Sequence, residues 1–160
     1  MSSESAWTTS GPPPASSSAT PPEFYADENV VTRSVCRRLK QLGYVVHTPS
    51  ELFGTREAAS GALDEDWLPK VGQRRWTILG RDLKIYERPR ELEAYRRARV
   101  QVFLLPGQAT AAELPRLVEV NLAHVCAIAA IRQQGSWRLT ESGPVLYDTR
   151  SRLQRRRSGR

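Results

Sequence analysis

The chain has 160 residues, 39% of them hydrophobic, and a formal net charge of +7, and this length can hold one domain with a hydrophobic core. Its two cysteines, Cys36 and Cys126, exclude a disulfide scaffold and suit reduced thiols in a cytoplasmic protein. Because it has neither an apolar run of 18 residues nor a basic and then apolar N-terminal leader, we expect no membrane span and no secretion.

The positive charge is concentrated near the C-terminus. Residues 1–22 carry one acid and no base, residues 23–148 carry 18 Lys/Arg against 16 Asp/Glu, and residues 149–160 carry six arginines and no acid. The Ser/Pro-rich segment 1–22 has little apolar surface to offset the entropy of ordering, so we expect it to be disordered, like the basic tail 149–160. That tail either binds nucleic-acid phosphates or is a solvated tail that aids solubility. One folded domain is expected over residues 23–148.

Residues 24–47 have the pattern of a strand, a helix and a second strand. The run 24–26 is a short buried strand, and Asn29 is placed to cap the helix that follows. Gly43 is placed to end that helix, and 44–47 is the second strand, which predicts a right-handed βαβ unit. The helix has one apolar face, made by Val31, Val35, Leu39 and Leu42.

The middle of the chain is predicted to form a loop, a helix and a third strand. Residues 48–63 are rich in Ser, Gly, Thr and Ala, which favours a loop. A helix follows from about Asp66, because Pro69 would remove a backbone donor from a helix that began much earlier. The third buried strand is 76–79, and it leads into Gly80-Arg81-Asp82. We expect Trp67 and Trp76 to belong to the core.

The C-terminal part is predicted to add two helices and two strands. A charged helix around 91–97 precedes a fourth strand at 100–105. Thr110 and Glu113 then have the spacing of a capping box before a long apolar-faced helix. Residues 136–140 are predicted to form a fifth strand, at the edge of the sheet.

Short apolar strands that alternate with helices predict an α/β protein with a mostly parallel central sheet, covered on both faces. Active sites in such sheets form at the carboxyl ends of the strands, where Asp27 and Asp82 fall. Asp64 or Asp66 lies at the start of the intervening helix, a favourable place for an anion. Carboxylates grouped in this way can hold Mg²⁺ or Mn²⁺, which neutralises charge on a phosphodiester and makes a water nucleophilic.

Three motifs of the chain resemble the PIN-domain superfamily, and in particular the PIN-like toxins of bacterial type II toxin–antitoxin pairs. The resemblance covers about residues 23–140 and includes the strand 100–105. It implies a three-layer α/β/α sandwich and a Mg²⁺- or Mn²⁺-dependent endoribonuclease that hydrolyses RNA and is neutralised by a cognate antitoxin. Homodimers are common in that family. The motifs are Phe24-Tyr25-Ala26-Asp27-Glu28-Asn29, Asp64-Glu65-Asp66-Trp67-Leu68-Pro69 and Leu79-Gly80-Arg81-Asp82-Leu83-Lys84.

The resemblance also assigns roles to the acidic residues of these motifs. Asp27, Asp64 and Asp82 are the catalytic acids and metal ligands that it implies, and Asp66 is the alternative to Asp64. Glu28 is the nearest candidate for a fourth ligand. A contact with the RNA backbone near the metal is expected for three basic residues, although a solvated loop is an equally good reading of them. They are Arg81, Lys84 and Arg88.

Two positions depart from the family pattern. Gly80 stands where related proteins commonly have Thr or Ser, and Lys84 stands where many PIN domains have a fourth acid. These departures support a second hypothesis, a catalytically degenerate PIN-like module that binds RNA or a protein partner. A zinc site has little support, since His124 and Cys126 are spaced i, i+2 and point to different sides of a helix.

Overall fold

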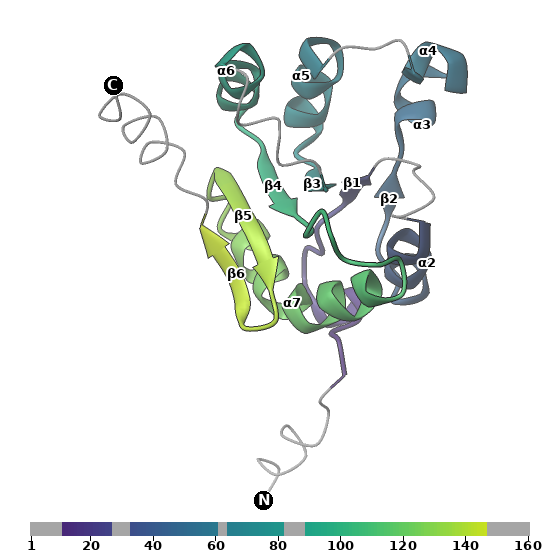
Figure 1. Cartoon of the computed structure of the whole chain (residues 1–160), viewed down its shortest axis with the longest axis vertical. Coiled ribbons are helices and arrows are strands. Elements are labelled where there is room, and N and C mark those ends of the chain that lie inside the picture. The colour runs from purple at the N-terminus through teal and green to yellow at the C-terminus, as the bar shows by residue number, and fades with distance from the viewer. Residues whose placement is uncertain (1–10, 27–32, 61–63, 82–88, 147–160) are drawn as a thin grey trace, which may run out of the picture.

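The structure, a computed structural model, describes residues 11–26, 33–60, 64–81 and 89–146. Its centre is a six-stranded sheet in the order β2-β1-β3-β4-β5-β6 (Figure 1). Strands β1 to β5 are parallel, and β6 pairs antiparallel with β5. The strands are β1 (Phe24–Ala26), β2 (Val46–His47), β3 (Thr77–Gly80), β4 (Gln101–Leu104), β5 (Gly135–Thr140) and β6 (Gly143–Leu146). The predicted class, α/β with a mostly parallel sheet, is confirmed.

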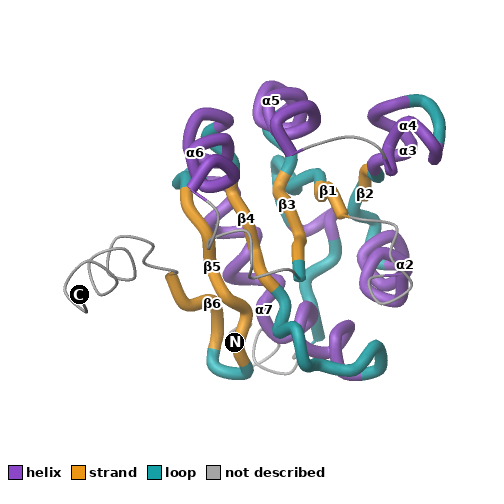
Figure 2. Tube along the Cα trace, turned by 45° about the horizontal axis from the view of Figure 1, so that its top comes forward, coloured by secondary structure: helices purple, strands orange, loops and turns teal. Residues whose placement is uncertain are grey.

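Helices cover both faces of this sheet. Helices α2 and α7 lie on one face and α5 and α6 on the other, as Figures 1 and 2 show. The molecule is therefore the expected three-layer α/β/α sandwich. The helical elements are η1 (Ala15–Ser17), α2 (Arg33–Gln41), α3 (Pro49–Phe53), α4 (Arg56–Ser60), α5 (Asp64–Arg74), α6 (Pro89–Ala98) and α7 (Glu113–Ala130).

The alternation of side chains along the strands divides the core into two clusters. Phe24 and Phe103 pack with α2 and α7, whereas Tyr25 and Val102 pack with α5 and α6. Successive residues of a strand point to opposite faces of a sheet. All four are buried because helices cover both faces. The largely apolar sequences of the central strands β1, β3 and β4 follow from this double burial.

Two predicted helix boundaries are confirmed by their hydrogen bonds. The Thr110 N–H donates to Glu113 Oε2 at 2.9 Å and the Glu113 N–H donates to Thr110 Oγ1 at 3.3 Å, so the capping box precedes α7. Gly43, with φ of +92°, ends α2, and the Tyr44 N–H reaches back to the Leu39 carbonyl at 3.0 Å. The predicted Asn29 cap lies outside the described residues.

Residues 48–63 do not form the predicted loop, because α3 and α4 lie within them. The Glu51 carboxylate accepts the Thr48 N–H at 3.3 Å, and Thr55 Oγ1 accepts the Ala58 N–H at 3.1 Å. The small polar residues that suggested a loop therefore include the caps of two short helices. Their helices are too short for an apolar period to be visible in the sequence.

Helix α5 begins at Asp64, two residues earlier than predicted, and Pro69 lies inside it. Proline removes one backbone donor from the helix. Leu68 and Val71, on either side of it, are completely buried against the sheet. Packing of this face outweighs one missing hydrogen bond, so the helix continues through the proline.

Residues 136–140 form the predicted fifth strand as part of β5, but its predicted place at the edge is wrong, because β6 pairs with β5 and forms that edge. Gly143-Pro144 reads as a turn in the sequence, but a proline is tolerated on an edge strand, which needs fewer donors. The buried Asn121 side chain of α7 donates to the Leu117 carbonyl at 2.7 Å and to the Thr140 carbonyl at 2.9 Å. It thereby connects α7 to the β5–β6 hairpin.

Part of the N-terminal segment differs from the expected disorder. Residues 11–22 are placed along the end of α2, where the Ala15 N–H donates to the Leu42 carbonyl at 2.8 Å. The Tyr44 hydroxyl donates to the Pro13 carbonyl at 2.8 Å, and Ala15 is buried. Prolines lower the entropy that such a segment loses on ordering. Residues 1–10 and 147–160 lie outside the described residues.

Candidate active site

The candidate site is formed where β1 and β3 end side by side. These strands are parallel neighbours, with Ala26 paired to Leu79. The chain leaves β1 toward β2 on one side and later returns to β3 on the other, so the strand order reverses between them. Ligands of open α/β sheets bind at such a reversal, outside the carboxyl ends of the strands. Asp27 follows β1 directly and Asp82 follows β3 after one residue.

Several predicted site residues lie outside the described part of the chain. The structure thus places the ends of β1 and β3, to which two of the predicted acids are joined in sequence, and not the acids themselves. The residues concerned are Asp27, Glu28, Asp82, Lys84 and Arg88. Within residues 11–26, 33–60, 64–81 and 89–146, no group of three or more His, Cys, Asp or Glu residues is arranged to hold a metal ion.

The second predicted acid is located by the start of α5. Asp64 is the first residue of this helix, and Asp66 is exposed on its first turn. The helix returns the chain antiparallel to β3, so its N-terminus lies at the carboxyl edge of the sheet. The unpaired N–H groups of a helix N-terminus favour anions. Asp64 and Asp66 both remain candidates for the second ligand.

Arg81 connects the end of β3 to the loop between β4 and α7. Its Nε donates to the Pro106 carbonyl at 3.2 Å, and its Nη2 donates to the Gly107 carbonyl at 2.7 Å and to the Ala109 carbonyl. The Leu105 N–H also donates to the Gly80 carbonyl, at 2.7 Å. Arg81 and Gly80 therefore hold this loop beside the end of β3. No local pattern in the sequence marks this role, and contact of Arg81 with RNA stays a prediction.

His47 and Cys126, which carry zinc-ligand chemistry, have other neighbours. His47 Nε2 lies 2.9 Å from Glu23 Oε1 and its Nδ1 lies 3.0 Å from Glu51 Oε2, while its ring stacks on Trp76 at 3.6 Å. Cys126 Sγ lies 3.3 Å from the Tyr44 hydroxyl, and burial raises the pKa of both groups. The Cys126 thiol is therefore held in its protonated form, which is a poor metal ligand.

Trp67 and Trp76 pack against the core, as predicted. Trp67 stacks on Tyr25 with ring centroids 5.1 Å apart, and Trp76 stacks on the same ring at 6.0 Å. Both pack against the cluster between the sheet and the α5–α6 layer. They position α5 over the sheet rather than offering free faces to a base.

Comparison with known proteins identifies the family. A family model described as PIN-like domain matches residues 22–107, which is more than half of the chain. No curated protein and no solved structure matches the chain. Of the helices that the structure describes, none has the length and apolar character needed to cross a membrane. The matched residues span β1 to β4 and both strand ends of the candidate site. The chain therefore belongs to the PIN-like domain family, whose fold is generally that of nucleases.

Proposed function

We propose that this protein is a metal-dependent endoribonuclease and the toxin of a toxin–antitoxin pair. The observation that carries the proposal is the pairing of β1 with β3, whose adjacent ends lead directly into Asp27 and Asp82. The start of α5 brings Asp64 to the same edge of the sheet. We therefore expect three carboxylates from three elements to meet at the edge where this class of fold binds its ligands.

The chemistry of these residues fits a hard divalent cation. Carboxylate oxygens are the ligands that Mg²⁺ and Mn²⁺ prefer, and no sulfur or imidazole belongs to the proposed set. A bound cation would neutralise the scissile phosphate and lower the pKa of a water at the site. Asp27, Asp64 and Asp82 would hold it, with Asp66 and Glu28 as further candidates.

The remaining residues of the edge would bind and position RNA. Lys84 and Arg88 follow β3 in sequence and would neutralise the backbone phosphates that flank the cleaved bond. Arg81 holds the β4–α7 loop through three carbonyls. A fixed loop would hold the substrate in one position relative to the carboxylates. Less entropy would then be lost on reaching the transition state.

RNA cleavage with added Mg²⁺ or Mn²⁺ tests the proposal. We expect Asp27→Asn and Asp82→Asn to lower the cleavage rate more than about 100-fold, because removal of a ligand exceeds the 10–100-fold effect of residues that only orient ligands. Glu141→Gln, which changes an exposed carboxylate on the β5–β6 turn, is the matched control and should cleave normally. Equal cleavage by all four proteins would contradict the assignment of the acids.

A degenerate module that binds without cleaving is the second candidate, and Gly80 favours it. A Cβ built on Gly80 would meet Leu104 Cδ2 at an ordinary 3.5 Å, and its φ is not in the left-handed region. The fold therefore has room for a side chain at position 80. The family's Thr or Ser could stand here, so its loss has a reason other than packing. Calorimetric titration with Mn²⁺ separates the candidates, because a module without a metal site would release no heat that depends on Asp27.

The toxin role has its own test. Induced expression of the wild-type chain in a bacterial host should arrest growth, and Asp27→Asn should relieve the arrest at equal protein level. A cognate antitoxin would act by covering the acidic edge, and should restore growth when it is produced from the neighbouring gene. Growth arrest that persists in Asp27→Asn would contradict a toxin that acts through this site.

A further inference from the structure

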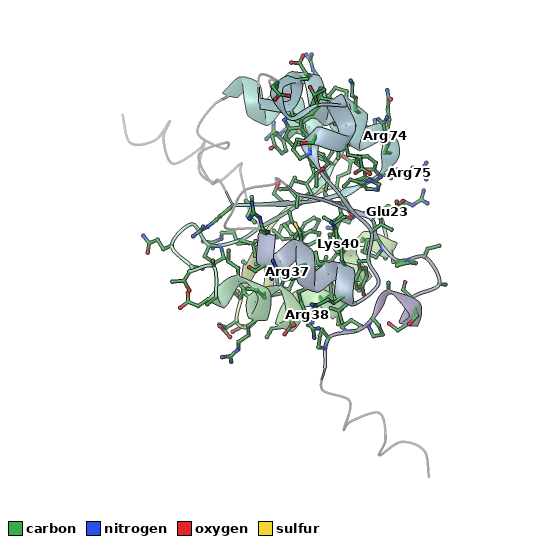
Figure 3. The ribbon with its side chains drawn as sticks, turned by 90° about the vertical axis from the view of Figure 1, so that its right-hand side faces the viewer. Glu23, Arg37, Arg38, Lys40, Arg74 and Arg75 are labelled. Carbon is green, nitrogen blue, oxygen red and sulfur yellow. The ribbon has the colours of Figure 1, made fainter. Side chains whose placement is uncertain are left out.

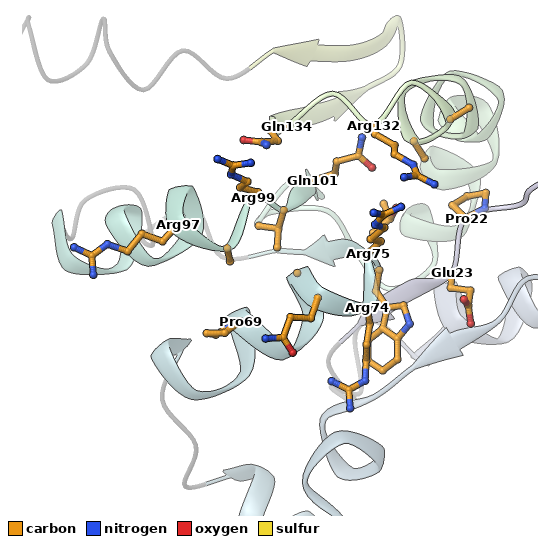
Figure 4. A pocket seen from close by; sticks show the side chains of 18 of the residues that line it. Pro22, Glu23, Pro69, Arg74, Arg75, Arg97, Arg99, Gln101, Arg132 and Gln134 are labelled. Atoms are coloured by element: carbon orange, nitrogen blue, oxygen red, sulfur yellow. The ribbon is translucent and has the colours of Figure 1, made fainter.

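A cavity with charged and apolar lining residues lies at the opposite edge of the sheet. It has a volume of about 1230 Å³ and is lined by residues that precede β1, β3, β4 and β5 and by the last turns of α5, α6 and α7 (Figure 4). All of these are amino ends of strands and carboxyl ends of helices. We call it the amino-edge pocket. Its charged lining residues are the arginines Arg74, Arg75, Arg97, Arg99 and Arg132 and the glutamates Glu23 and Glu93.

Three of these arginines occupy the same position at the ends of three helices. Arg75, Arg99 and Arg132 follow α5, α6 and α7, and their φ values are 58°, 55° and 54°. The N–H of each donates to the carbonyl three residues earlier, at 3.1, 3.2 and 3.1 Å. Each arginine thus stands at the left-handed residue that turns the chain from a helix into the next strand.

Arginine is an unusual choice for this position. A left-handed residue with a Cβ is strained, and glycine is the residue that helix ends of this type prefer. Helix α2, which ends in the same way, has Gly43 there, with φ of +92°. Conformation alone would select glycine at all four helix ends. Three arginines around one cavity therefore call for a reason beyond the backbone.

The guanidinium groups of these three residues are available to a ligand. Arg97 pairs with Glu93 at 3.2 Å, and Arg74 donates to the Lys70 carbonyl and lies over the Trp76 ring. Glu23 contacts His47 at 2.9 Å. Both glutamates of the pocket are thus engaged, and no ion pair is found for Arg75, Arg99 or Arg132 within the described ranges. All three side chains are exposed.

The side views show how these groups are arranged. In Figure 4, Arg75 and Arg132 extend from different helices toward the same part of the pocket, and Arg97 points away from it. Figure 3 shows Arg74 and Arg75 on the far side of Glu23 from the α2 residues Arg37 and Lys40. The positive groups of the pocket are thus separate from the basic surface of α2.

We propose that the amino-edge pocket binds the phosphate groups of a single-stranded RNA segment through Arg75, Arg99 and Arg132. Guanidinium groups recognise phosphate oxygens with two parallel hydrogen bonds. The pocket exceeds the 300–1,000 Å³ typical of sites for one small molecule, so it suits several nucleotides. The choice of RNA rests on the proposed function. The pocket lies a full strand length from the acidic edge, so it anchors RNA away from the bond that is cut.

The test is binding of a fluorescent single-stranded RNA to the full chain in EDTA, where no metal-dependent cleavage occurs. The variant Arg75→Gly/Arg99→Gly/Arg132→Gly should bind at least tenfold more weakly, and the slope of log K against log salt should fall by about 2, or roughly 0.7 for each lost contact. A second variant with Asn at the same three positions, which also tolerates the left-handed conformation, should behave alike.

A matched control removes the same charge elsewhere. Arg37→Gln/Lys40→Gln/Arg138→Gln changes three exposed residues outside the pocket and should bind within about threefold of wild type. The basic tail is present in every variant, so its contribution is common to all of them. Equal weakening by the control and by the glycine variant would overturn the proposal, because net charge alone would then explain binding.

Competitors identify the chemistry that the pocket recognises. Polyphosphate should displace the RNA at a lower concentration than polyglutamate of equal charge, and inorganic phosphate should displace it weakly because one phosphate engages one arginine. If polyglutamate competes equally, the pocket takes acidic polypeptides and the proposal is wrong. Asp82→Asn should bind RNA normally in this assay. If the wild-type chain does not cleave RNA with added Mg²⁺ or Mn²⁺ but still shows arginine-dependent binding in EDTA, the proposed function has failed while this inference stands.

Discussion

The two edges of the sheet differ in the charge that their helix ends favour, for one physical reason. Parallel strands place the N-termini of the crossover helices α2, α5, α6 and α7 at the carboxyl edge and their C-termini at the amino edge. Helix N-termini favour anions and C-termini favour cations. Asp64 at the start of α5 and Arg75 after its end both follow this rule. A charge of the favoured sign at a helix end stabilises the helix whether or not it also has a function. Experiments must therefore measure activity and stability separately for each variant.

The largest expected effect separates the two acids at the start of α5. Asp64→Asn should lower RNA cleavage more than about 100-fold, because it would remove a metal ligand, whereas Asp66→Asn should lower it less than about tenfold. Both variants lose an anion at the same helix N-terminus, worth roughly 0.3–1 kcal/mol of stability each. Cleavage rates and thermal unfolding of both proteins are to be measured side by side.

The comparison of these two variants is internally controlled. If both acids only stabilise the helix end, the two variants lose similar stability and similar activity. A large activity difference at equal stability identifies the ligand. The opposite order, with Asp66→Asn the more damaging, would move the second ligand to Asp66, and equal small losses would remove this helix from the site.

Arg81 gives an intermediate effect and distinguishes an RNA contact from a structural role. Its three bonds to carbonyls predict that Arg81→Ala lowers the free energy of unfolding by about 1.5–3 kcal/mol. Arg81→Lys keeps the charge and cannot reproduce the fork, so it should lose most of the same stability. Urea unfolding measures both. If lysine restores stability and RNA affinity together, Arg81 acts as a charge near RNA and not as the anchor of the β4–α7 loop.

The fold was predictable from the sequence where its signal is local. The strand Phe24–Ala26, the capping box at Thr110 and Glu113, and the ending of α2 at Gly43 each depend on a few neighbouring residues. The family resemblance rests on similar short motifs, and the match to the PIN-like domain family includes all three of them. Local preference and tertiary structure agree at these positions.

What the sequence did not reveal depends on contacts between distant segments. The Arg81 anchor joins residues 25 to 28 positions apart, and no local pattern marks it. The three left-handed arginines of the amino-edge pocket are each more than 20 residues apart in the sequence, and the sheet brings them together.

The handedness of the crossover through α7 also departs from expectation. This crossover steps in the same direction as the crossover through α6 but uses the opposite face, so the two have opposite hands.

The smallest expected effect is a change in stability at the helix ends. It tests whether the left-handed arginines of the amino-edge pocket stabilise the helices or are kept for binding. Arg99→Gly relieves a left-handed residue with a Cβ, worth about 1–2 kcal/mol, and loses a favourable charge at a helix C-terminus, worth about 0.3–1 kcal/mol. We expect stability to stay equal or to rise by up to about 1.7 kcal/mol. Arg99→Ala keeps the strain and loses the charge, so it should be less stable than wild type by about 0.3–1 kcal/mol.

The reciprocal change, Gly43→Arg, measures how much stability an arginine costs at a left-handed helix end. Gly43→Arg introduces a Cβ at the same kind of helix end, where it would meet Ala15 Cβ at an ordinary 3.5 Å, so its cost of about 1–2 kcal/mol measures the backbone strain itself. If Gly43→Arg is costly and Arg99→Gly is neutral or stabilising, the arginine is kept at the expense of stability, which is what a binding site requires. If Arg99→Gly is as damaging as Arg99→Ala, the charge stabilises the helix end by more than the strain costs, and RNA binding is not needed to explain it.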